Sequence, residues 1–210
     1  YKYITKNEIV NMINKDILVS GDLFLFHARG FNPFSMGIRQ LTQSFWNHTG
    51  LYYTDLYKQG FIIEALGGGV VKTPVEKYLD EKKSILRVVR IKPEAFKDAL
   101  EYDSGIALAI GRIKEKVGSK YDWGAIAWLA FVYIVKGGYK KIREYIPVGN
   151  PLQSRNKFFC SELLCEGFRG VSALHPYLFQ GKTLQKCNTT TPRDISKSMW
   201  VSWVAGRDLI

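Results

Sequence analysis

The sequence predicts a single α+β domain with a largely antiparallel sheet. Strand and helix patterns occur in groups and do not alternate one by one, which is typical of α+β rather than α/β proteins. The chain has 210 residues, of which 46% are hydrophobic, and this is enough to bury one core. Because no low-complexity tract or internal repeat divides the chain, we expect one domain that spans residues 1–210.

The first half of the chain contains most of the expected strands. Alternating apolar residues or β-branched runs between turn-like segments indicate strands; these are residues 21–28, 47–54, 60–66, 68–73 and 84–91. Apolar residues at helical spacing, or a proline at a first helical position, indicate helices; these are residues 5–17, 33–45 and 73–81. The short connections between successive strands favour hairpins.

The second half of the chain is mainly helical. A long helical pattern at residues 92–118 ends at a glycine, and an apolar helical run follows at residues 123–135. The helix that contains the cysteine covers residues 157–168, and a short helix opens at a Thr-Pro turn at residues 191–195. A polar loop is expected between the second and third of these helices. Residues 199–206 are expected to form a final strand.

The net charge favours an anionic partner. Lys and Arg number 30 against 19 Asp and Glu, which gives a charge of +11. Candidate partners are nucleic acid, a phospholipid surface and an anionic cell-wall polymer. The cations are scattered, and neither zinc-finger spacing nor a basic helix with interleaved aromatics is present, so nucleic acid is disfavoured. The apolar run at residues 123–135 is shorter than the roughly 20 residues a spanning helix needs, but peripheral membrane contact stays open.

The cysteine pattern points away from a disulfide framework and from metal binding. Cys160 and Cys165 lie on one expected helix and Cys187 lies in a polar loop. Three cysteines cannot all pair, and C-x-x-C spacing is absent, so we expect neither a disulfide framework nor a cofactor or metal. No signal peptide is visible, but an upstream segment can be removed, which leaves an exported or cell-envelope location open.

Cys160 is the candidate nucleophile. The segment "KFFCSELLCEGF" places this cysteine at the front of its helix, where unpaired backbone N–H groups and the helix dipole favour an anion. Such a position increases the thiolate fraction. The alternative is a small buried hydrophobe, which is the ordinary role of a free cysteine.

His48 and Glu64 are the candidate partners of this thiol. His48 shares one face of its expected strand with Gly50, which leaves open space beside the imidazole. Glu64 is a carboxylate inside an otherwise apolar strand, and such a group is costly unless it is paired. If the two strands form a hairpin, Glu64 can orient His48. His27 is expected to be structural and His175 to lie in a loop.

These residues fall within a set of motifs that resembles a known family. Six segments follow one another along the chain: "GDLFLFHARG", "SFWNHTGLYY", "FIIEALGGGVVKTPVEKYL", "VGSKYDW", "FFCSELL" and "TPRDI". Their order is similar to that of circularly permuted NlpC-type papain-like cysteine hydrolases. That group includes bacterial permuted amidase-like proteins, orthopoxvirus relatives and, more distantly, the lecithin retinol acyltransferase type. The resemblance covers roughly residues 21–198.

The resemblance implies a permuted papain-like fold and a role for four residues. Its histidine corresponds to His48 in "WNH", its polar third member to Glu64 in "IEA", and its nucleophile to Cys160 in "FFCSE". A tyrosine near the nucleophile corresponds to Tyr121 in "G-x-x-YD". The implied activity is that of a cysteine peptidase or amidase acting on an amide or ester in peptide, cell-wall peptide or lipid, through an acyl-enzyme. The alternatives are a binding module without turnover and a lipid acyltransferase with the same triad.

Overall fold

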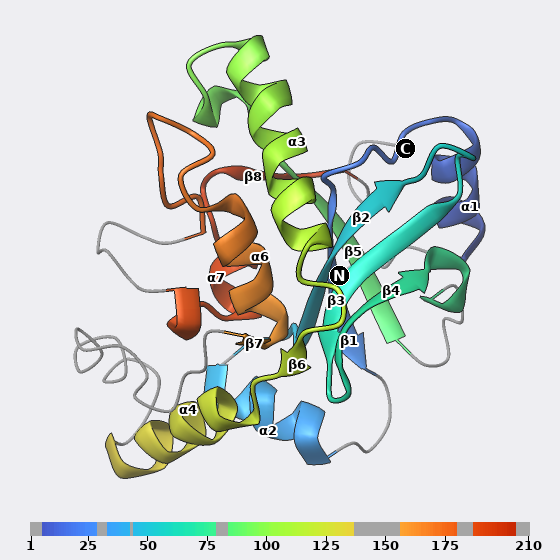
Figure 1. Ribbon diagram of the computed structural model, residues 1–210. Coiled ribbons are helices and arrows are strands. Elements are labelled where there is room, and N and C mark those ends of the chain that lie inside the picture. The colour runs from blue at the N-terminus through green and yellow to red at the C-terminus, as the bar shows by residue number, and fades with distance from the viewer. Residues whose placement is uncertain are drawn as a thin grey trace.

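One antiparallel sheet and the helices on its faces make up most of the protein (Figure 1). The computed structural model describes residues 6–28, 33–42, 44–78, 84–136, 156–179 and 187–204. Within them, the sheet has the strand order β4-β3-β2-β1-β5-β8. Its strands are β1 (Leu23–Ala28), β2 (His48–Thr54), β3 (Gly60–Leu66), β4 (Gly69–Pro74), β5 (Ser84–Ile91) and β8 (Val201–Trp203). The predicted α+β class and largely antiparallel sheet are confirmed.

The described residues also form helices and a second, two-stranded ladder. The α-helices are α1 (Lys6–Asn14), α2 (Pro33–Thr42), α3 (Ala99–Lys114), α4 (Trp123–Lys136), α6 (Cys160–Phe168) and α7 (Pro192–Ser196). The 3₁₀ turns are η1 (Val75–Tyr78), η2 (Pro93–Ala95) and η3 (Cys187–Thr189). Strands β6 (Lys120–Tyr121) and β7 (Lys157–Phe158) pair in parallel.

Strand alternation divides the apolar residues between two cores. On β1, Leu23 and Leu25 face one core and Phe24 and Phe26 face the other, as expected for side chains that alternate across a strand. The larger core lies between the sheet and helices α3 and α6, and the smaller core is covered by α1. Figure 1 shows α3 and α6 on one side of the sheet and α1 on the other.

The β3–β4 hairpin is fastened to the segment that leads into β6. Gly69 has a φ of +130°, and a Cβ at this position would lie 2.5 Å from the carbonyl oxygen of Ser119. The N–H of Val70 donates to that same oxygen at 2.8 Å. The glycines after β3 therefore make a turn, as the sequence predicts, and one of them also allows this close approach.

Several predicted boundaries are wrong. The helix predicted at residues 92–118 begins only at Ala99, because Asp98 caps it by accepting a hydrogen bond from the N–H of Glu101 at 2.8 Å. In the helix predicted at 73–81, the first two residues belong to β4 and residues 75–78 form the 3₁₀ turn η1, and the strand predicted at 199–206 shortens to β8. Residues 79–81, 205 and 206, and most of the expected polar loop after α4, lie outside the described residues.

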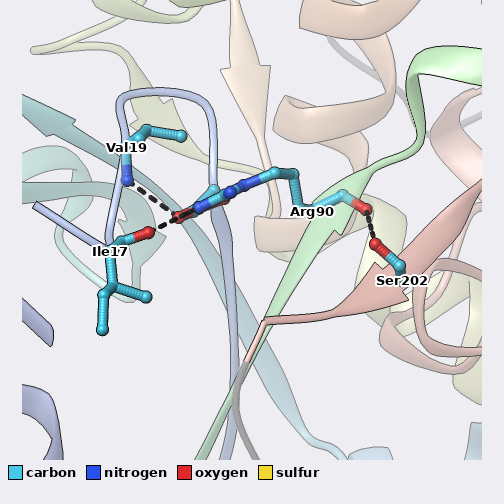
Figure 2. A network of polar contacts seen from close by, with 5 residues as sticks. Ile17, Val19, Arg90 and Ser202 are labelled. Atoms are coloured by element: carbon cyan, nitrogen blue, oxygen red, sulfur yellow. Dashed lines mark hydrogen bonds and ion pairs between the residues drawn. The ribbon is translucent and has the colours of Figure 1, made fainter. Parts of the chain in front are cut away.

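An ion pair between a partly exposed arginine and a fully buried carboxylate holds the segment before β1 against the sheet (Figure 2). Arg90 on β5 donates to both carboxylate oxygens of Asp22, at 2.6 and 2.8 Å, and to the carbonyl of Ile17 at 2.7 Å. Asp22 is fully buried and also accepts from the N–H of Val19. Burial raises the pKa of Asp22, while the hydrogen bonds from Arg90 and Val19 oppose that rise.

We expect the Arg90→Met variant to lose about 3 kcal/mol of unfolding free energy, because it leaves the Asp22 carboxylate buried without its cation. Chemical denaturation followed by circular dichroism measures this change. The exposed-lysine control Lys97→Met should stay within about 0.5 kcal/mol of the starting protein. A loss in Arg90→Met no larger than that of the control would show that the ion pair contributes nothing.

Candidate active site

Cys160 is the first residue of α6 and is buried. The preceding residue, Phe159, has an extended backbone and provides no side-chain acceptor for the first-turn N–H groups. A thiolate at this position therefore lies beside the positive end of the helix dipole. Cys160 is also the one free cysteine among the described residues. The expected position at the helix front is confirmed.

His48 is the residue of the sheet that contacts this thiol. It is the first residue of β2, and α6 packs along β2 and β3. The imidazole is hydrogen-bonded to Cys160 on one side and to Glu64 on the other. Its Nε2 lies 2.6 Å from Oε2 of Glu64, which leaves Nδ1 for the thiol. The ring also packs against Phe26 with 5.2 Å between centroids, which restricts its rotation.

The register of the β2–β3 hairpin makes the His48–Glu64 contact possible. Gly50 on β2 pairs with Glu64 on β3. His48, two residues earlier on the same face, is then the diagonal neighbour of Glu64. A Cβ at Gly50 would lie 2.5 Å from Ile62 and 3.2 Å from the Cβ of Glu64. The open space that the sequence indicates at Gly50 is thus filled by the strand that carries the carboxylate.

Tyr78 is a contact of the site that the sequence analysis missed. Its hydroxyl donates to Oε1 of Glu64, the oxygen that His48 does not use. Thr73 also hydrogen-bonds this carboxylate. Tyr78 lies on the η1 turn that follows β4, and its ring packs against Phe26 with 4.7 Å between centroids. No periodic pattern marks such a residue, because its role depends on where a single turn places one hydroxyl.

The surroundings of His48 and Glu64 stabilise the charged forms of both side chains. Burial by itself lowers the pKa of His48, but the hydrogen bonds and negative charges of Cys160 and Glu64 outweigh this and raise it to about 10. Burial by itself raises the pKa of Glu64, but His48 above all, together with Thr73 and Tyr78, lowers it. The site therefore favours a protonated imidazole and an ionised Glu64 carboxylate at neutral pH.

Tyr121 lies beside the thiol, as the resemblance implies. It is buried on β6 and lines a cavity together with Cys160. Burial, followed by the negative charges of Cys160, Asp122 and Glu162, raises the pKa of its phenol. The hydroxyl is therefore a neutral donor over the working range of the other groups. Asp122 caps α4 by accepting from the N–H of Ala125 at 2.9 Å.

The other two histidines lie outside this arrangement. His27 contacts the carbonyl of Phe45 through Nδ1 at 2.6 Å and stacks on the Phe45 ring at 4.0 Å. His175 stacks on Trp200 with 3.8 Å between ring centroids. Both rings are therefore engaged in packing contacts away from Cys160.

The sequence predicts no disulfide framework, but one disulfide bond does form. Cys165 and Cys187 are bonded, with an S–S distance of 2.08 Å and 5.2 Å between their Cα atoms. Helical geometry turns Cys165 away from Cys160 by about 140°, and that direction leads to η3. Both bonded cysteines are buried. Residues 22 apart meet here because the chain returns to α6, which spacing alone does not reveal.

Comparisons with known proteins agree with the fold and assign no function. No family model matches the chain, and no curated protein matches it. One similar solved structure is that of the metalloprotein yiiX, DUF1105, from Escherichia coli O157:H7. It has a TM-score of 0.54 and 17% identity, and the match covers 89% of this chain and 96% of that one. At this identity the likeness concerns the fold alone.

Native protein treated with iodoacetamide without reductant should take up one label, at Cys160. The bond between Cys165 and Cys187 protects those two sulfur atoms, whereas Cys160 carries a free thiol next to His48. Peptide mass mapping before and after reduction in denaturant measures this, and three labels are expected after reduction. Labelling of Cys165 or Cys187 in the unreduced native protein would show that the disulfide is absent.

Proposed function

We propose that the protein is a cysteine hydrolase with a permuted papain-like fold that cleaves an amide or ester bond through an acyl-enzyme. The observation that carries the proposal is one imidazole placed between a thiol at a helix front and a buried carboxylate. A nucleophile, a base and a group that orients the base are the three parts that covalent acyl transfer requires. Cys160, His48 and Glu64 supply them in that order.

In the first step, the Cys160 sulfur attacks the substrate carbonyl while His48 holds the proton. The bond from carbon to sulfur forms and the carbonyl oxygen becomes an oxyanion. We assign the oxyanion to the backbone N–H groups of the first turn of α6 and to the phenol of Tyr121, which lines the cavity together with Cys160. The tetrahedral intermediate collapses when protonated His48 gives its proton to the leaving amine or alcohol, which leaves a thioester on Cys160.

In the second step, water hydrolyses the thioester. Neutral His48 takes a proton from the water as it attacks, and the oxyanion forms again in the same place. Collapse breaks the carbon–sulfur bond, and the product acid leaves. The proton on His48 then restores the starting ion pair. Glu64 holds Nε2 through both steps, so that Nδ1 keeps facing the reacting atoms.

The order of parts along the chain supports the permuted papain-like assignment. The histidine strand β2 comes first, the acid strand β3 second and the cysteine helix α6 last, whereas ordinary papain-like enzymes begin with the cysteine helix. The similar E. coli protein is named a metalloprotein. In the part of this chain that the structure describes, no group of three or more His, Cys, Asp or Glu side chains fits a metal ion. The proposed steps are built on the side chains around Cys160.

The wall of the small cavity beside Cys160, which has a volume of about 30 Å³, is mainly apolar. Its walls include Ile38 on α2, Ile126 on α4 and Phe159 before α6. The hydroxyls of Thr42, Ser161 and Thr191 in the same wall donate to protein acceptors within 2.8 Å. These hydroxyls are already satisfied, so the wall offers mainly hydrocarbon to a ligand. The same cavity suits a lipid acyltransferase, in which an acceptor other than water takes the acyl group.

We expect Cys160→Ser to remove turnover of p-nitrophenyl acyl esters and Glu64→Gln to retain part of it. In Glu64→Gln the new amide oxygen can still accept from His48, and the new NH₂ group can donate to the Tyr78 oxygen. Glu64→Ala should lose more, because the imidazole is then unheld, but less than the roughly 10⁴-fold loss seen in serine-protease triads. Steady-state rates with folding checked by circular dichroism measure these effects.

Matched histidine variants provide the control for that series. His48→Gln should lose activity as Cys160→Ser does, whereas His27→Gln changes a histidine of the neighbouring strand β1 and should keep it. Undiminished turnover in a folded Cys160→Ser protein would refute the hydrolase proposal. A folded wild type that binds such esters without cleaving them would favour the binding module instead.

The alkaline limit of kcat/KM should lie near pH 10, where His48 loses the proton that it gives to the leaving group. Because Glu64 is one of the groups that raise the pKa of His48, Glu64→Gln should move this limit down by about one pH unit or more. The same linkage applies to stability. The contribution of protonated His48 is complete below its ordinary pKa of 6.5 and is lost as pH rises through about 10. A limit that does not move in Glu64→Gln would contradict the assigned coupling.

A further inference from the structure

Helix α4 has an apolar face turned to solvent. The segment Trp123–Val135 contains no charged side chain, and a helix that is apolar all round is normally buried in a core or a membrane. Trp123 is 51% exposed and Phe131 is 55% exposed, and Ala127 between them is also exposed. Residues four apart lie on the same side of a helix. The three therefore form one stripe, which we call the α4 stripe.

The tip of the β3–β4 hairpin extends this surface. The indole N–H of Trp123 donates to the carbonyl of Gly67 at 3.2 Å. A Cβ at Gly67 would lie 3.0 Å from the Trp123 ring, so hairpin and helix touch here. Leu66, next to Gly67, is 39% exposed. In Figure 1, α4 extends away from the sheet, with its first turn close to this hairpin.

Two lysines stand beside the stripe with like charges facing each other. Lys120 and Lys157 are direct partners in the parallel β6–β7 ladder, and both are exposed. Like charges opposite one another destabilise a strand pair unless an anion lies between them. Lys120 is three residues before Trp123.

A part of α4 next to the stripe reaches the candidate active site. Ile126 lines the cavity next to Cys160, and α4 contacts α2, which contributes Ile38 to the same cavity. A surface that binds the α4 stripe would therefore lie against the helix that forms part of this cavity wall.

We propose that the α4 stripe and the Lys120–Lys157 pair dock the protein onto an anionic lipid bilayer. Aromatic and aliphatic side chains enter the interface between headgroups and acyl chains, and the lysines bind lipid phosphates. The helix lies on the membrane: none of the described helices has the length and apolarity to cross one. A net charge of +11 favours an anionic surface over a second copy of the same chain. This docking is independent of whether Cys160 turns over substrate.

Co-sedimentation with vesicles of phosphatidylcholine, with and without phosphatidylglycerol, tests the proposal on the full chain. The protein should bind the anionic vesicles and bind neutral vesicles weakly. Phe131→Glu, and separately the double variant Lys120→Glu with Lys157→Glu, should each weaken binding about tenfold or more. Phe131 is more than half exposed, and the ring contact that it makes is with Trp128 on the same helix, so we expect the Phe131→Glu variant to fold. Circular dichroism checks this.

Matched controls separate docking from general effects of charge and of exposed aromatic rings. Lys77→Glu with Lys97→Glu makes the same change in net charge, and Tyr57→Glu places an acid on an aromatic that is 85% exposed. Both should bind as wild type does. Equal losses in controls and test variants, or no binding of wild type to anionic vesicles, would overturn the proposal. It would also fail if sedimentation equilibrium showed a dimer that Phe131→Glu dissociates, because a second copy would then cover the stripe.

Discussion

A fully buried carboxylate, Glu64, is the constraint around which the candidate site is arranged. An ionised side chain without solvent is tolerated only where charge and hydrogen bonds replace the lost hydration. Glu64 receives a hydrogen bond from His48 on one oxygen and from Tyr78 on the other. Burial of β3 therefore requires that β2 and η1 place the side chains of His48 and Tyr78 within hydrogen-bond distance of Glu64. Gly50 makes the meeting of the two strands sterically possible.

The sequence predicts the parts of this arrangement that depend on local chemistry. A carboxylate within "FIIEAL" requires a partner wherever the strand is buried, and His48 is within reach as soon as the neighbouring strands form a hairpin. The cysteine at the front of an apolar helix is equally visible. The helix expected from residue 92 shows the limit: a pattern continuous in sequence is broken at Asp98, whose side chain caps α3 by accepting from the N–H of Glu101.

What the sequence does not predict depends on contacts between distant segments. Tyr78 reaches Glu64 only because η1 follows β4 around the edge of the hairpin, and the pattern of residues 73–81 favours a longer helix. Cys187 sits in a polar stretch with nothing to mark it as buried. The exposure of α4 is another such case, because an apolar run indicates a core helix until the surrounding structure shows which side is covered.

Helix α6 carries the Cys165–Cys187 disulfide on one side and the free thiol of Cys160 on the opposite side. The proposed mechanism needs the Cys160 thiol in its reduced form, and the disulfide ties α6 to η3. Thiolates attack disulfides readily when the sulfur atoms can align. The turn of about 140° between residues five apart on a helix keeps Cys160 from attacking the bond beside it. Because the helix keeps Cys160 apart from the disulfide, an oxidant that forms the bond between Cys165 and Cys187 need not oxidise the Cys160 thiol.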